Sequence, residues 1–179
     1  MKTLRYCVAL SATTLVLAGC GADAEPKFEA EPSSTPTSAS PTPDKPEPWE
    51  ERSDEGAIAF VEHWIDAYNR MRSSGETDAV EAISSKRCES CIGSIELTRQ
   101  IYSAGGSLRT TGWKVVSISE PAVAEAAQPV IGIRIERAPQ VLRESADAEP
   151  QRFAGGPADY TAHLMWESGR WLMDRLDLA

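Results

Sequence analysis

The chain has 179 residues, of which 18 are lysine or arginine and 27 are aspartate or glutamate, so its formal net charge is −9 at pH 7. This length fits one globular domain with an additional tail. No run of basic residues occurs, which together with the acidic balance argues against nucleic acid as a partner.

The first residues have the pattern of a secretory signal peptide. Lys2 and Arg5 precede an apolar segment of about eleven residues, 8–18. A helix needs about 20 residues to cross a bilayer, whereas the apolar region of a signal peptide has about 7–15. We therefore assign residues 1–19 to a signal peptide that is removed by cleavage.

This segment ends in Leu17-Ala18-Gly19-Cys20, which resembles the lipobox of bacterial lipoproteins. The resemblance implies that the Cys20 thiol receives a diacylglyceryl group and that the chain is cut just before it. It also implies attachment to the extracytoplasmic face of the cell membrane, because two or more acyl chains, such as palmitate, anchor a protein firmly. The alternative is an ordinary signal peptide with an incidental cysteine.

Residues 20–56 are expected to form a disordered tether. Seven of the twelve prolines and ten acidic residues fall within 21–56, interleaved with serine and threonine. Such a composition buries too little apolar area to offset the loss of chain entropy on folding. Its Ser/Thr-Pro tracts are also of the kind that carries O-linked sugar. A single globular domain is then expected at residues 57–179.

Two cysteines remain for the globular domain once Cys7 leaves with the signal peptide and Cys20 is lipidated. We expect Cys88 and Cys91 to form a disulfide that fixes a corner between two helices, because exported thiols tend to be oxidised. Two alternatives stay open. A zinc site would need two further ligands, and neither histidine has metal-ligand spacing to the pair. A redox-active CxxC would need a thioredoxin-like context.

The domain begins with a long amphipathic helix. Apolar residues recur at intervals of three and four over residues 57–71. Ser53 or Asp54 is its expected cap, and Ser73-Ser74-Gly75 ends it.

Two shorter helices are expected next. The first covers residues 77–83, with Thr77 as its cap and Ala79, Val80 and Ile83 facing inward. The second covers residues 92–103 and is ended by two glycines. Its expected apolar members are Ile92, Ile95, Leu97, Ile101 and Tyr102.

The pattern then changes to alternation, which is typical of strands. Four strands are expected, and residues 140–143 extend the second of them after Pro139. Helices followed by antiparallel strands indicate an α+β fold, with the N-terminal helices packed on one face of a curved antiparallel sheet of about four strands. The expected strands cover residues 113–119, 130–136, 160–167 and 170–176.

Ser168-Gly169 is a two-residue turn between the last two strands, and it sets their register. This register places His163 opposite Asp174, as the one candidate catalytic pair. A carboxylate beside an imidazole raises its pKa and fixes its tautomer, as a general base requires. However, no Ser or Cys nucleophile motif accompanies the pair, and cross-strand His–Asp contacts commonly do no more than stabilise a sheet. No motif for a metal, a nucleotide or another cofactor is found. The other expected pairs are Glu167 with Arg170, Trp166 with Trp171, Met165 with Leu172 and Leu164 with Met173.

One long helix, two shorter helices and a closing four-stranded meander are similar to the nuclear-transport-factor-2-like, or cystatin-like, α+β cone. The segment 164–174 (LMWESGRWLMD) resembles the last hairpin of that superfamily. With the lipobox, the tether and the CxxC, residues 17–179 also resemble an uncharacterised family of actinobacterial lipoproteins, which brings no assigned activity. The superfamily implies a conical pocket between the long helix and the sheet, and it commonly forms homodimers through the sheet.

Three functional hypotheses follow. The first is a lipid-anchored binding or scaffold module of the cell envelope, which holds an envelope protein or a small apolar ligand. The second is a small isomerase- or hydrolase-like enzyme that uses His163 as base and Asp174 to orient it. The third is a disulfide-active module built on Cys88 and Cys91.

Overall fold

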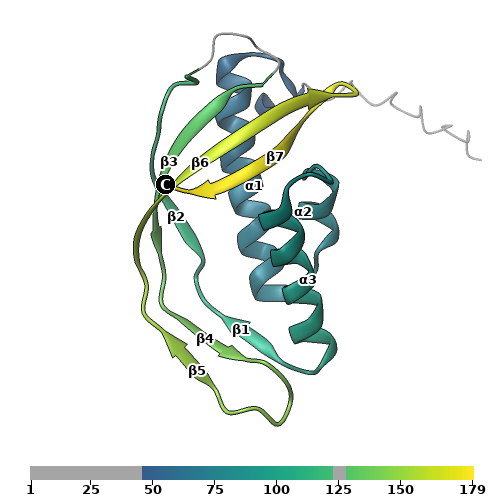
Figure 1. The fold of residues 1–179 in the computed structure, drawn as a ribbon, viewed down its shortest axis with the longest axis vertical. Coiled ribbons are helices and arrows are strands. Elements are labelled where there is room, and N and C mark those ends of the chain that lie inside the picture. The colour runs from purple at the N-terminus through teal and green to yellow at the C-terminus, as the bar shows by residue number, and fades with distance from the viewer. Residues whose placement is uncertain (1–45, 123–127) are drawn as a thin grey trace, which may run out of the picture. The chain divides into compact units, whose positions relative to one another are not determined.

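The computed structural model describes residues 46–122 and 128–179. The signal peptide, Cys20 and most of the tether lie outside the described residues. Three α-helices lie on one side of a bent arrangement of strands (Figure 1). In chain order the elements are η1 (Pro48–Glu50), α1 (Asp54–Ser74), α2 (Asp78–Ala82), α3 (Glu89–Ser103), β1 (Ser107–Arg109), β2 (Trp113–Ile118), β3 (Val130–Arg137), β4 (Gln140–Arg143), β5 (Gln151–Phe153), β6 (Gly156–Glu167) and β7 (Arg170–Leu178).

Helix α1 has the ends that its sequence predicts. The Ser53 hydroxyl oxygen accepts a hydrogen bond from the Gly56 amide at 3.0 Å, which satisfies one of the first backbone donors. Gly75 ends the helix with a φ of 83°, a left-handed conformation that glycine adopts without strain. No helix in the described ranges is both long enough and apolar enough to cross a membrane.

The two shorter helices depart from prediction in detail. In α2, Val80 is buried as expected, but Ala79 is exposed. Helix α3 begins three residues earlier than predicted, with Cys88 as its N-cap residue. Leu97 was expected on the buried face, but 56% of its surface is exposed. Because Ile95 and Thr98 hold the inward positions, Leu97 lies on the outer side of the helix.

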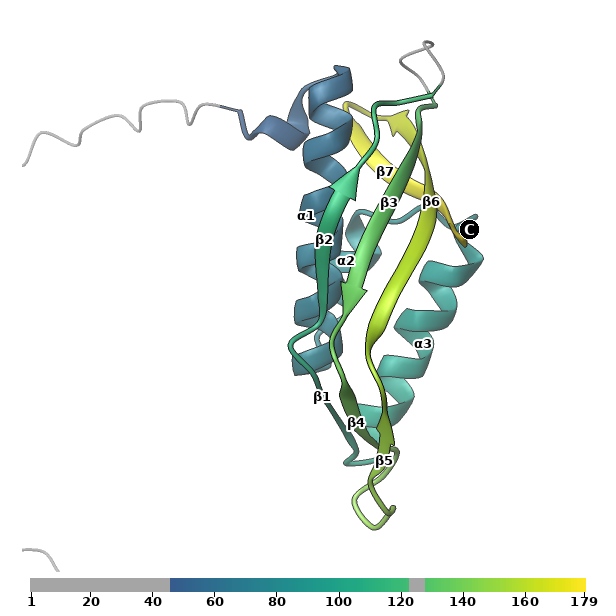
Figure 2. The same ribbon diagram turned by 90° about the vertical axis from the view of Figure 1, so that its left-hand side faces the viewer.

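The strands form two antiparallel sheets rather than one. The larger sheet has the order β2-β3-β6-β7, which agrees with the predicted four strands. The smaller sheet has the order β1-β4-β5, and Figure 2 shows it below the larger one. The segment 140–143 was predicted to extend β3, but it is the separate strand β4, because Ala138 and Pro139 interrupt the ladder. Strands β1 and β5, of three residues each, were not predicted.

The final hairpin keeps its predicted register only as far as Leu164. Ser168 and Gly169 both have positive φ, as a two-residue hairpin turn requires. The four pairs nearest the turn are the predicted ones, down to Leu164 with Met173. A β-bulge then follows, and His163 pairs with Arg175. The predicted pairing of His163 with Asp174 is therefore wrong, because Asp174 is the extra residue of the bulge.

Stacked aromatic rings fill the middle of the space between α1 and the larger sheet. The ring centroids of Trp64 and Tyr68 are 5.1 Å apart, those of Tyr68 and Trp113 are 4.6 Å apart, and those of Trp113 and Tyr160 are 4.9 Å apart. Such stacked or tilted pairs stabilise a core beyond their buried area. The conical pocket that the superfamily resemblance implies is therefore occupied by side chains at its centre.

The chain that enters α1 also packs on the domain. The Trp49 ring of η1 stacks on His63 at 4.2 Å, and the Trp171 indole donates a hydrogen bond to the Glu51 carbonyl at 2.9 Å. Both contacts involve residues that precede residue 57, the predicted start of the globular domain.

Candidate functional site

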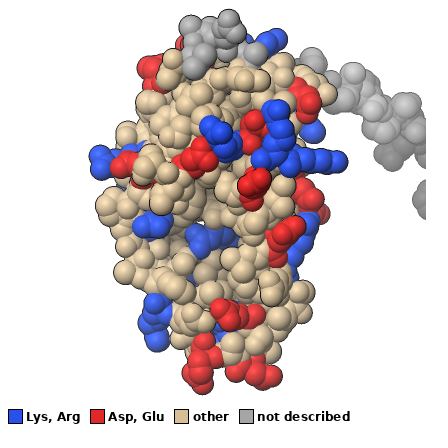
Figure 3. Space-filling model, in the orientation of Figure 1, with Lys and Arg blue, Asp and Glu red and all other residues tan. Residues whose placement is uncertain are grey.

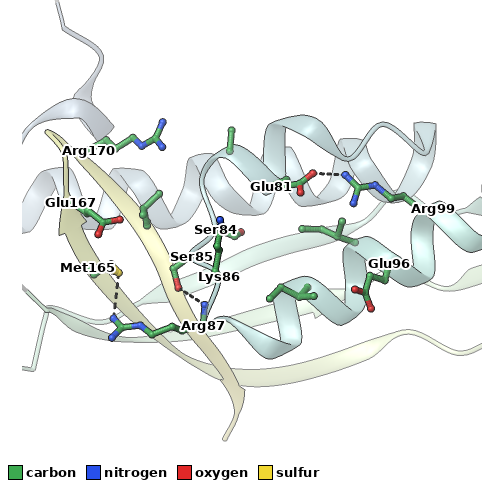
Figure 4. Close-up of a pocket in the computed structure, with 14 residues that line it drawn as sticks. Glu81, Ser84, Ser85, Lys86, Arg87, Glu96, Arg99, Met165, Glu167 and Arg170 are labelled. Carbon is green, nitrogen blue, oxygen red and sulfur yellow. Dashed lines mark hydrogen bonds and ion pairs between the residues drawn. The ribbon is translucent and has the colours of Figure 1, made fainter.

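A cavity of about 750 Å³ lies between the β6–β7 hairpin and the α2–α3 region, and we call it the hairpin groove (Figure 4). Its apolar lining comes from α2, α3 and the hairpin, and its charged lining comes from all of the surrounding elements. The groove is lined by Glu81, Ala82, Ser84, Ser85, Lys86, Arg87, Ile92, Ile95, Glu96, Arg99, Met165, Glu167, Arg170 and Leu172.

One wall of the groove is the connection between α2 and α3, which is bonded to strand β7. The Ser85 amide donates to the Met173 carbonyl at 2.8 Å, and the Met173 amide donates to the Ile83 carbonyl at 3.0 Å. The buried Trp64 indole donates to the Ser84 hydroxyl at 2.9 Å. These bonds hold the connection as a short parallel extension of the sheet and fix the position of the groove wall.

Asp174 binds this connection through its side chain. Its Oδ1 accepts a hydrogen bond from the Ser85 hydroxyl at 2.7 Å and one from Arg87 Nε at 3.0 Å, and its Oδ2 accepts one from Arg87 Nη2 at 3.0 Å. Arg87 Nη2 also lies 3.4 Å from the Met165 sulfur. Arg87 is thus held in place in the groove wall, with its charge neutralised by Asp174.

The expected disulfide joins Cys88 and Cys91 across the first turn of α3, with a Cα–Cα distance of 5.2 Å. Both cysteines are buried. Between them, the Ser90 hydroxyl donates to the Leu176 carbonyl at 2.8 Å. The two thiols are bonded to each other rather than free to hold a metal, and the described residues contain no cluster of three metal-binding side chains. The disulfide ties the start of α3 to its own first turn beside β7.

The groove carries charges of both signs. Glu81 forms an ion pair with Arg99, as Figure 4 shows. The remaining charged side chains of the rim are two cations and two carboxylates, and none of them forms an ion pair within the described ranges. In the orientation of Figure 1, Figure 3 shows basic and acidic side chains side by side where the hairpin passes over the helices. The four unpaired groups are Lys86, Glu96, Glu167 and Arg170.

The structure does not bring the predicted catalytic pair into contact. His163 Nε2 lies 2.8 Å from Arg175 Nη2 and 3.3 Å from Asp177 Oδ2. A second cavity, of about 400 Å³, has both His163 and Asp174 on its wall. No hydrogen bond or ion pair joins the two side chains in the described part of the chain, because the bulge directs Asp174 to Arg87. Asp174 therefore does not orient the His163 imidazole, as the enzyme hypothesis requires.

Sequence reasoning missed the hairpin groove. Its walls come from residues 81–99 and from residues 165–172, which no local pattern relates. One signal was available: Ser84-Ser85-Lys86-Arg87 is a polar segment between two short helices, directly before the CxxC.

Comparison with solved structures shows likeness of fold. The intermembrane space region of chloroplast protein ARC6 is similar with a TM-score of 0.54 and 8% identity, over 70% of this chain and 95% of that chain. An uncharacterised protein with a cystatin-like fold from Caulobacter vibrioides has a TM-score of 0.44 and 9% identity, over 69% and 90% of the two chains. A hexachlorocyclohexane dehydrochlorinase (LinA) of type 2 has a TM-score of 0.43 and 9% identity, over 69% of this chain and 84% of that chain.

The predicted α+β class, with N-terminal helices and an antiparallel sheet of four strands, is confirmed. At such identities the likeness concerns the fold alone, and a fold does not choose between a binding module and an enzyme. No curated protein has a significant match to the sequence. A family model, described as a family of unknown function (DUF6318), matches residues 27–177.

Proposed function

We propose that this chain, which belongs to the family of unknown function DUF6318, is a lipid-anchored binding module of the cell envelope. It holds an extended segment of a partner protein in the hairpin groove. The lipobox at Cys20 and the resemblance to actinobacterial lipoproteins support the anchor. The Cys88–Cys91 disulfide supports an oxidising compartment outside the cytoplasm.

The composition of the hairpin groove is the observation that supports a binding role. Ile92 and Ile95 of α3 and Met165 and Leu172 of the hairpin line it, so that an apolar side chain of a partner would contact both elements. Burial of such a side chain supplies about 1.5–3 kcal/mol. A volume of about 750 Å³ lies within the range of sites that enclose a ligand.

The rim indicates what kind of partner the groove fits. Lys86 and Arg170 are exposed cations that can pair with carboxylates of a partner, and Glu96 and Glu167 are exposed carboxylates that can pair with its cations. A partner segment with an apolar centre and charges of both signs satisfies all four groups. A small apolar ligand would gain nothing from these charges, whereas a charged segment can pair with them, and therefore we favour the peptide.

A peptide library tests this proposal. Random linear peptides are selected for binding to the full chain, and the affinity of the enriched peptide is measured by fluorescence anisotropy. We expect enriched sequences with an apolar centre and flanking charges. Ile92→Ala should weaken binding about tenfold or more, because it removes part of the apolar lining.

The matched control is Leu97→Ala, an aliphatic truncation on the same helix at an exposed position outside the groove. It should leave the affinity within about twofold of wild type, since no buried contact is lost. Lys86→Gln and Lys114→Gln form a second pair, with Lys114 on β2 and away from the groove. If the groove variant and its control change the affinity equally in both pairs, the hairpin groove is rejected as the binding site. It is also rejected if no peptide is enriched.

A further inference from the structure

A separate cavity of about 290 Å³ lies where α1, β2, β6 and the β3–β4 junction meet. We call it the arginine cup, and its defining residues are Tyr68, Arg72, Trp113, Arg137, Gln140 and Tyr160. We propose that it binds a small organic anion with a flat apolar body, such as an aromatic carboxylate. This inference does not depend on the hairpin groove.

Flat aromatic rings make one wall of the cup. Tyr68, Trp113 and Tyr160 are the last three rings of the stack between α1 and the sheet, with neighbouring centroids 4.6 and 4.9 Å apart. Tyr68 is buried, and Trp113 and Tyr160 are partly exposed. Because each ring is packed against the next, the wall is formed before any ligand arrives. A planar apolar group can stack on such a wall.

The charged groups of the cup are both cations. Arg72 lies over the Tyr68 ring, 5.6 Å from its centroid, and donates a hydrogen bond to the Gln140 side-chain oxygen. Arg137 lies at the end of β3, where its Nε is 3.5 Å from the Gly156 carbonyl. These partners orient the two guanidinium groups but do not neutralise them.

No carboxylate of the described residues compensates this charge. Among the described residues, no aspartate or glutamate lines the cup, and neither Arg72 nor Arg137 forms an ion pair. A bound carboxylate would offset part of this charge and form the charge-assisted hydrogen bonds that guanidinium groups favour.

Tyr160 adds a polar group to the site. Burial is the main cause that raises the pKa of its hydroxyl, and Arg137 and Arg72 act in the opposite direction because both guanidinium groups lie near it. A hydroxyl that stays protonated at neutral pH can donate to an anion beside the two cations. The cup is at the small end of ligand-binding cavities, which suits a small molecule rather than a protein segment.

Calorimetric titration of the full chain tests the proposal with three probes: 2-naphthoate, the neutral 2-naphthamide and acetate. We expect 2-naphthoate to bind with a Kd of about 1 mM or tighter. 2-Naphthamide lacks the charge and acetate lacks the ring, so each should bind at least about tenfold more weakly, as expected when a bond to a charged group or an apolar contact is lost. Equal binding of naphthoate and naphthamide would overturn the proposal, as would the absence of naphthoate binding.

Substitutions locate the site. Arg137→Gln should weaken naphthoate binding about tenfold, because it removes a charged donor while its exposed position leaves folding intact. Arg152→Gln is the matched control, since Arg152 is an exposed arginine on β5 that does not line the cup. Arg72→Gln should act like Arg137→Gln, with circular dichroism to check its fold. If Arg137→Gln and Arg152→Gln bind naphthoate equally, the anion does not bind in this cup.

Discussion

The Asp174 carboxylate on β7 binds the Arg87 guanidinium with both of its oxygens, at 3.0 Å each. The same carboxylate accepts the Ser85 hydroxyl at 2.7 Å, so one side chain joins the α2–α3 connection to the sheet. This contact forms a wall of the hairpin groove and replaces the His163–Asp174 pair that the sequence suggested. Its consequence for stability can be measured.

Asp174→Ala should lower the free energy of unfolding by about 1–2 kcal/mol, measured by urea denaturation. The loss arises mainly from the Ser85 hydroxyl, which is buried and would lack its acceptor. The Arg87 side chain is 64% exposed, and its charge therefore contributes little. Asp159→Ala, which breaks the exposed pair with Arg134, is the control and should change stability by at most about 0.5 kcal/mol. Similar losses in the two variants would show that Asp174 is an ordinary surface partner.

Replacing both Cys88 and Cys91 by alanine should destabilise the domain by about 2 kcal/mol, the value expected for so short a loop. Urea unfolding of the oxidised wild type and of the double variant measures this difference. Reductant should lower the stability of the wild type and leave the variant unchanged. A wild type that is no more stable than the variant would contradict a structural role.

Burial of the two sulfur atoms predicts how the disulfide reacts. Cys88 and Cys91 are 0% and 1% exposed, so a thiol reductant should reach them slowly in the native protein and rapidly in urea. Labelling of the released thiols follows the reaction. Equally rapid reduction in both conditions would favour the disulfide-active hypothesis over a structural bond.

Cys20→Ser should move the full chain from the membrane fraction to the soluble fraction, because acylation of the thiol is the proposed attachment. Cell fractionation with metabolic labelling by a palmitate analogue measures both location and modification. Cys7→Ser, in the proposed signal peptide, is the control and should leave label and location unchanged. If the Cys20→Ser protein stays with the membrane, another attachment is present.

The His63 ring should make stability depend on pH. Burial is the main cause that lowers the pKa of His63 below its usual 6.5, and the charge of Arg70 lowers it further, while Asp66 and Glu47 act in the opposite direction. With a folded-state pKa below the unfolded one, the unfolded state binds more protons between the two values. The contribution of His63 is therefore present above pH 6.5 and is lost as pH falls toward the folded-state pKa.

Urea unfolding between pH 5 and pH 7.5 measures this effect. His63→Gln should reduce the loss of stability on acidification. Trp49→Ala should act in the same direction, because it removes the ring stacked on His63 and exposes the imidazole to water. An unchanged pH dependence in both variants would show that other groups cause the acid loss.

Predictions succeeded where the structure is determined by neighbours in sequence. The caps of α1 at Ser53 and Gly75 and the turn at Ser168-Gly169 depend on a few adjacent residues, and their chemistry is visible in the chain. Leu97 was wrongly assigned to the buried face of α3, because it follows Ile95 by two residues, a spacing that does not share a helix face, and Ile95 and Thr98 face inward.

The sequence by itself determined the α+β class, the long helix, the last hairpin and the pairing of two cysteines three residues apart. Only the tertiary structure decided what Asp174 binds, because a one-residue bulge shifts the register beyond Leu164 and leaves Asp174 bonded to Ser85 and Arg87. The hairpin groove and the arginine cup were likewise beyond prediction. Their walls combine segments distant in sequence, and the periods of helices and strands encode only which residues share a face, not which faces meet.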